Sequence, residues 1–124
     1  MHETVKNLIN VQNSIKSKLI DLKQNSRIPK IIAVSKTFKI DHIIPLINHG
    51  HLDFGENKVQ EAIDKWSEIK STNKSIKIHL IGKLQTNKVK FAVKFFDFIH
   101  SLDSEKLAKK ISEEQNKQNL KPKI

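Results

Sequence analysis

The sequence predicts an α/β fold built on a parallel sheet. Three observations support this prediction: a long amphipathic segment opens the chain, four short apolar runs come after it, and a helical pattern follows each run. Neighbouring parallel strands need a crossover connection, which a helix usually provides. The 124 residues contain no flexible linker or low-complexity block, so one domain spanning residues 1–124 is expected.

The first predicted element is a long helix over residues 3–25. Residues 27–29 include a proline and are expected to end it. The apolar residues that recur at helical spacing are Val5, Leu8, Ile15, Leu19 and Leu22. This helix must therefore pack one face against another part of the chain.

The first strand and helix follow directly. Residues 31–34 form a short continuous apolar run, which is typical of a strand covered on both faces. Asp41 is expected to cap the next helix, with Pro45 in its first turn. Gly50 is expected to end this helix in a left-handed conformation.

Three further strands are predicted at residues 51–55, 76–82 and 96–101. The helix after the second strand has an apolar face formed by Val59, Ala62, Ile63, Trp66 and Ile69. Thr86 is expected to cap the third helix, which runs to Phe95, and Asp103 or Ser104 to open the fourth. An apolar end at Ile124 indicates the start of a fifth strand that is cut off.

A formal net charge of +10 gives the chain a strong attraction for polyanions. Lysine carries almost all of this charge, whereas base readout and the forked binding of phosphate favour arginine. A lysine-rich nucleic-acid-binding domain is therefore a disfavoured alternative.

Neither a membrane span nor a targeting segment is predicted. Polar residues interrupt the first 22 positions every few residues, which is unlike a signal peptide or a transmembrane helix. The chain has no cysteine, so disulfides, thiolate metal sites and cysteine nucleophiles are excluded. These observations predict a cytoplasmic protein.

Polar residues follow each predicted strand, and Lys36 is the most informative of them. It shares the parity of Ile32 and Val34, which predicts a poorly hydrated amine. Desolvation increases the neutral fraction of an amine, which can attack a carbonyl carbon. The alternative is a lysine at a strand end that extends into solvent.

Two other polar positions have competing interpretations. Asn57 with Gln60 resembles a helix-capping pair, although Asn57 could equally contact a ligand. His79 is expected to be a hydrogen-bonded core histidine. No metal site is predicted, because the histidines around Gly50 lack further ligands.

Four strings in order, "IIAVSKT", "DFGENKVQE", "HLIGKLQTNK" and "IHSLDS", resemble the pyridoxal 5'-phosphate homeostasis proteins, the YggS/PROSC family. The resemblance implies the fold of the N-terminal TIM barrel of alanine racemase, with pyridoxal 5'-phosphate (PLP) as the cofactor. It also implies that Lys36 forms the internal aldimine and that Asn57 lies near the cofactor. The residues implied to line the same cavity are His79, Gly82, Gln85, Asn87 and Lys88.

This chain departs from the family pattern in two respects. Lys83 and Thr86 replace residues of the common "GHLQSNK" string, and Lys83 adds a cation there. The family barrel also continues for roughly as many residues again, consistent with ordinary barrel lengths. The resemblance therefore implies the N-terminal half of a TIM (β/α)8 barrel, with about four βα units and without the phosphate-binding residues of the other half.

The resemblance implies a carrier or regulator of PLP without robust turnover. Its expected partners are PLP, and amino acids or PLP-dependent apoenzymes. An amino acid racemase is a disfavoured alternative, because related racemases use a tyrosine as second base and this sequence has none. The open edges of a half-barrel predict a homo-oligomer.

Overall fold

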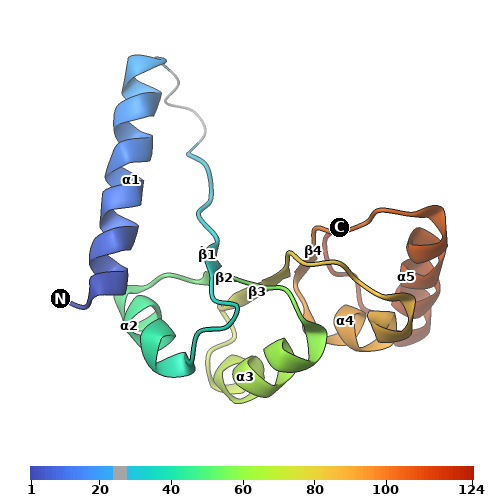
Figure 1. Ribbon diagram of the computed structural model, residues 1–124. Coiled ribbons are helices and arrows are strands. Elements are labelled where there is room, and N and C mark those ends of the chain that lie inside the picture. Colours follow the sequence, from blue (N-terminus) through green and yellow to red (C-terminus); the bar gives the residue numbers. More distant parts are fainter. Residues whose placement is uncertain (24–27) are drawn as a thin grey trace. The chain divides into compact units, whose positions relative to one another are not determined.

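The computed structural model describes residues 1–23 and 28–124 (Figure 1). The elements along the chain are α1 (Glu3–Asp21), β1 (Ala33–Val34), α2 (Ile40–His49), β2 (Asp53–Glu56), α3 (Val59–Thr72), β3 (Lys77–Leu80), the 3₁₀ helix η1 (Thr86–Lys88), α4 (Val89–Phe95), β4 (Phe98–Ile99) and α5 (Glu105–Gln118). None of the helices in these residues is long and apolar enough to cross a membrane.

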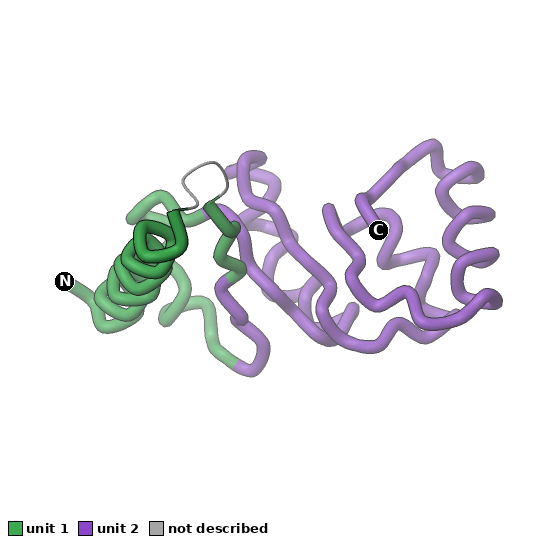
Figure 2. The backbone as a smooth tube through the Cα atoms, turned by 90° about the horizontal axis from the view of Figure 1, so that it is seen from above, with its two compact units in different colours: residues 1–32, 38–51 green, residues 33–37, 52–124 purple. Residues whose placement is uncertain are grey.

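The backbone forms two compact units, one of residues 1–32 and 38–51 and the other of residues 33–37 and 52–124 (Figure 2). In the first unit, α1 packs against α2. Val5 and Leu8 are buried on α1, but Leu22 is 56% exposed, so only the start of the predicted apolar stripe is buried. The helix ends at Asp21, earlier than predicted. Residues 24–27, which include the predicted end of the helix and the first residue of the segment expected to stop it, lie outside the described residues.

Helix α2 differs from its prediction at its start. Lys39 occupies the N-cap position and makes no side-chain cap, whereas Asp41 lies inside the first turn and Pro45 in the second. A carboxylate in the first turn is still favoured by the helix dipole, so Asp41 need not be the cap residue. Gly50 ends the helix with φ +102°, as predicted.

The second unit contains a parallel sheet in the order β1-β2-β3-β4. The register pairs Val34 with Gly55, Gly55 with His79, and His79 with Phe98. Strands alternate with helices along the chain, which confirms the predicted α/β class. A parallel bridge joins Phe98 to Lys123, one residue before the predicted start of a fifth strand.

The two faces of the sheet are covered differently. Phe54, Ile78 and Leu80 lie on the face covered by helices and are completely buried. Helices α3 and α4 lie along this side of the strands in Figure 1, and the Trp66 ring of α3 packs on Phe54 at 4.8 Å between centroids. On the opposite face, Val34 is 49% exposed. The apolar core of this unit therefore lies between the sheet and its helices.

The last two helices test the predicted caps. The Ser104 hydroxyl accepts a hydrogen bond from the Leu107 amide at 3.1 Å, which confirms one of the two predicted openings of α5. Thr86 is not a cap: it is the first residue of η1, Gln85 precedes it, and α4 begins only at Val89. The tighter 3₁₀ turn takes up the residues that the prediction assigned to the start of α4.

Candidate functional site

The polar residues that follow the strands gather at one edge of the sheet. The hydrogen-bond ladder continues past the strands, from the Ser35 amide to the Gly55 carbonyl at 2.9 Å and from the Ile81 amide to the Glu56 carbonyl at 2.9 Å. Carboxyl ends of parallel strands form the usual ligand-binding edge of α/β proteins. The predicted site residues near these strand ends therefore come from neighbouring positions of one edge.

Lys36 lies in the turn directly after β1, as predicted, but its side chain is exposed. The expectation of a poorly hydrated amine was wrong. Burial of Lys36 required cover on the face that carries Val34, and Val34 itself is 49% exposed. Lys36 follows the end of β1, and Asn57 follows the end of the paired strand β2, so both residues belong to the same edge of the sheet.

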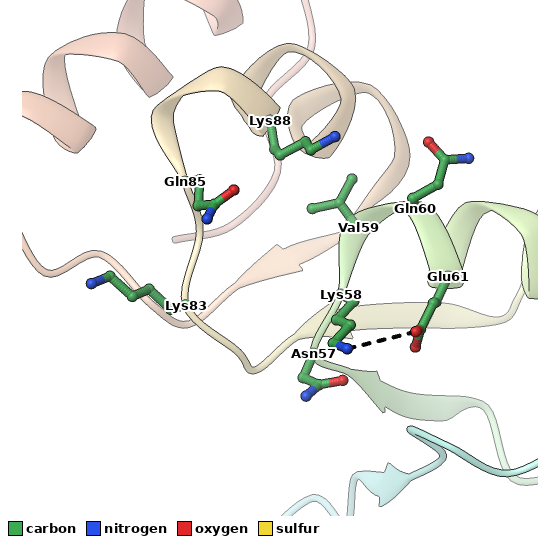
Figure 3. Close-up of a pocket in the computed structure, with 8 residues that line it drawn as sticks. All are labelled: Asn57, Lys58, Val59, Gln60, Glu61, Lys83, Gln85 and Lys88. Atoms are coloured by element: carbon green, nitrogen blue, oxygen red, sulfur yellow. Dashed lines mark ion pairs between the residues drawn. The ribbon is translucent and has the colours of Figure 1, made fainter.

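A cavity of about 440 Å³ lies between the β2–α3 connection and the segment that leads from β3 to η1 (Figure 3). Its lining residues are Asn57, Lys58, Val59, Gln60, Glu61, Lys83, Gln85 and Lys88. Lys58 pairs with Glu61 at 3.8 Å. Three lysines and one carboxylate give the lining a net positive charge, which favours an anionic ligand.

Asn57 does not cap α3, because Lys58 occupies the N-cap position and makes no side-chain cap. The capping interpretation was therefore wrong, and the side chain lines the cavity instead. Gly82 lies against Asn57: a β-carbon at Gly82 would come within 2.4 Å of the Asn57 carbonyl oxygen. The absence of a side chain at Gly82 allows the two strand ends to approach this closely.

His79 is a core histidine, as predicted. It is 2% exposed, its Nε2 lies 2.8 Å from Asp53 Oδ1, and its Nδ1 lies 2.9 Å from His100 Nε2. The ring also stacks on Phe98 at 4.2 Å. His79 is not among the residues that line the cavity beside Asn57. Among the described residues, no group of three or more His, Cys, Asp or Glu side chains could hold a metal ion.

Asn87 belongs to a different hollow from Asn57. It lines a second cavity of about 420 Å³ with Thr86, Lys106, Lys109, Lys110 and Glu113. The structure therefore brings Asn57, Gln85, Lys88 and, through its backbone contact, Gly82 together, whereas Asn87 lines the second cavity.

Sequence reasoning missed a buried polar cluster behind the strand ends. Glu56 is completely buried on the helix-covered face, where it accepts hydrogen bonds from Ser35, Lys65 and Trp66. The sequence did carry a signal, since Glu56 shares the parity of the apolar Phe54 and a charged group at such a position needs a partner.

No family model matches the chain. Among curated proteins, the pyridoxal phosphate homeostasis protein of Pasteurella multocida is 34% identical over 109 residues, 88% of this chain and 47% of that protein. The protein of the same name from Buchnera aphidicola is 44% identical over 107 residues, 82% of this chain and 46% of that protein. The chain thus spans about half the length of the curated relatives it matches.

A solved structure supports the same relationship. PipY of Synechococcus elongatus, in a structure with PLP bound, is 38% identical and superimposes with a TM-score of 0.68, over 85% of this chain and 50% of that one. The structure of PipY without PLP gives a TM-score of 0.71. These similarities confirm the resemblance that the four strings indicated: the chain is similar to the pyridoxal phosphate homeostasis proteins over about half of their length.

Proposed function

We propose that this chain binds PLP, that its role is in PLP homeostasis, and that Lys36 supplies the amine that captures the cofactor. The observation that carries the proposal is the position of Lys36 in the turn at the carboxyl end of β1, next to strand β2, whose own end carries Asn57. The names of the curated relatives and the PLP-bound structure of PipY support the same ligand.

The residues at this edge fit the chemistry of the cofactor. PLP supplies two groups, an aldehyde and a negatively charged phosphate. The aldehyde condenses with a primary amine and releases one water. Exposed Lys36 is accessible to such a molecule once it has lost a proton to solvent. Asn57 and Gln85 offer amide groups, and the lysines around them favour an anion. In this proposal Lys36 acts by accessibility and position, without the burial that the sequence predicted.

We propose that the chain carries PLP and does not turn over an amino acid substrate. Transfer of the cofactor to an apoenzyme requires only capture and release at Lys36. A racemase would in addition exchange the α-hydrogen of an amino acid, so incubation with PLP and alanine in deuterium oxide distinguishes the two functions. Deuterium at the α-carbon above the level given by PLP alone would favour the racemase.

Lys36→Ala is expected to abolish specific capture of PLP. Borohydride reduction after mixing with one equivalent of PLP should fix the label on Lys36 in the parent protein, as located by peptide mass spectrometry. Without this amine we expect apparent affinity to fall at least about tenfold, a loss of about 1.4 kcal/mol of binding free energy.

Lys94→Ala is the control, because Lys94 is an exposed lysine on α4 outside the cavity. It should bind PLP like the parent protein. Label spread evenly over surface lysines of the parent protein would refute the proposed site.

We also propose self-association through the open edge of the sheet. Strand β1 ends the strand order on one side, and its Val34 is 49% exposed. Edge strands with exposed apolar residues tend to pair with another chain. Light scattering at micromolar concentration should give at least twice the monomer mass of 14.3 kDa, and a strictly monomeric mass would contradict the prediction.

A further inference from the structure

The buried Glu56 cluster holds the backbone on which Lys36 sits. Glu56 is completely buried, and its carboxylate accepts hydrogen bonds from Lys65 at 3.1 Å, from the Trp66 indole at 3.2 Å and from the Ser35 hydroxyl. Lys65 and Trp66 belong to α3. A buried carboxylate is tolerated only with such partners. The cluster therefore ties the end of β1 to β2 and α3.

Every polar group of Ser35 takes part in these contacts. Its amide donates to the Gly55 carbonyl at 2.9 Å, its carbonyl accepts from Lys65 Nζ at 2.7 Å, and its hydroxyl donates to Glu56. Ser35 is only 4% exposed. The residue immediately before Lys36 is therefore fixed at its amide, its carbonyl and its side chain.

The residue after Lys36 is also constrained. Thr37 adopts φ +66°, a left-handed conformation that residues with a β-carbon rarely adopt. The Ser35 side chain is directed to Glu56 on the helix-covered face, and the turn that carries Lys36 starts from this fixed residue. The conformation of the turn thus decides where the amine is presented.

We propose that Glu56 and Lys65 are positioning residues, which hold Ser35 so that the Lys36 amine is presented at the strand-end edge for capture of an aldehyde. This inference rests on the proposed role of Lys36. Neither Glu56 nor Lys65 has to touch the ligand. Buried ion pairs contribute little to stability compared with apolar residues of the same volume, so a role in geometry accounts for their presence at this place.

A matched pair of lysines on α3 allows a direct test. Lys65 bonds a backbone carbonyl and the Glu56 carboxylate, and Lys70 likewise bonds the Phe95 carbonyl at 2.8 Å and Asp97 at 2.9 Å. Their side chains are 15% and 20% exposed. Lys70 makes none of these contacts with Ser35, so Lys70→Met removes a similar ion pair without releasing the turn.

The experiment measures the rate at which PLP, trapped with borohydride, labels Lys36 in the full chain, normalised to the fraction folded by circular dichroism. Lys65→Met should slow labelling of Lys36 roughly tenfold or more, because small misplacements of a reacting group cost large factors in rate. Lys70→Met should leave this rate unchanged. If Lys65→Met does not fold, Ser35→Ala replaces it, since that change removes only one hydroxyl from the cluster.

The outcomes separate this inference from the proposed function. Equal Lys36 labelling rates in the parent protein and in the folded Lys65→Met or Ser35→Ala variant would overturn the positioning role and leave the role of Lys36 intact. If Lys70→Met slowed the labelling of Lys36 as much as Lys65→Met does, the positioning role would also be overturned. A general loss of stability would then explain the slower labelling in both variants. A parent protein that is not labelled at Lys36 would refute both.

Discussion

Replacing Gly82 with alanine is expected to weaken PLP binding at least about tenfold, or about 1.4 kcal/mol, and to destabilise the fold by about 1–3 kcal/mol. A β-carbon at this position would lie 2.4 Å from the carbonyl oxygen of Asn57 and 2.7 Å from its β-carbon. Two of the three nearest atoms belong to backbone, which cannot move aside as a flexible side chain can. The strand ends must then separate, and Asn57 is displaced from the cavity wall. Absorbance titration with PLP and urea unfolding measure the two effects.

Gly50→Ala is the matched control for this prediction. Gly50 has no atom within 4 Å of an added β-carbon, but its φ of +102° is unfavourable for alanine. We expect roughly 1–2 kcal/mol of destabilisation from the backbone alone and unchanged affinity for PLP. Unchanged affinity in Gly82→Ala as well would show that the close approach to Asn57 has no part in binding.

Trp66→Ala is expected to cause the largest loss of stability, about 3–5 kcal/mol. The ring is completely buried and packs on Phe54, and its indole nitrogen donates to Glu56 at 3.2 Å. Truncation opens a large cavity beneath the sheet and removes one partner of a buried carboxylate. Urea unfolding followed by far-ultraviolet circular dichroism measures the change, since Trp66 is the single tryptophan of the chain.

Two further variants divide this effect into its parts. Trp66→Phe keeps most of the apolar volume and removes the donor to Glu56, so it should cost roughly 1–3 kcal/mol. Phe91→Ala removes an aromatic ring that is 47% exposed and should change stability by no more than about 0.5 kcal/mol. A similar loss in Phe91→Ala and Trp66→Ala would contradict the assignment of the core to the space between sheet and helices.

The order of elements could be predicted because apolar periodicity is a local property of the sequence. The runs around Val34, Phe54, Ile78 and Ile99 all became strands of one parallel sheet. The predicted strands were longer than the observed ones, because an apolar residue continues the sequence pattern even where the hydrogen bonds between strands have ended. The predicted cap at Thr86 failed for a similar reason: the pattern does not distinguish an α-helical start from a 3₁₀ turn.

The site was only partly predictable. The place of Lys36 at a strand end followed from the length of the apolar run, but its exposure depends on what covers the opposite face of the sheet, which no local pattern encodes. The contact between Gly82 and Asn57 joins residues 25 positions apart and depends on the register of β2 and β3. The partners of Glu56 come from two separate segments, the end of β1 and helix α3, so a single string could not reveal them.

The hydrogen bonds of His79 also determine which tautomer each neighbouring ring adopts. If both imidazoles are neutral, His79 carries its hydrogen on Nε2 to donate to Asp53, and its Nδ1 must then accept. His100 therefore carries its hydrogen on Nε2 to donate to His79, and its own Nδ1 is then an acceptor on an exposed ring. An aspartate in the sheet thus sets, through one buried ring, the tautomer of an exposed ring on the neighbouring strand end.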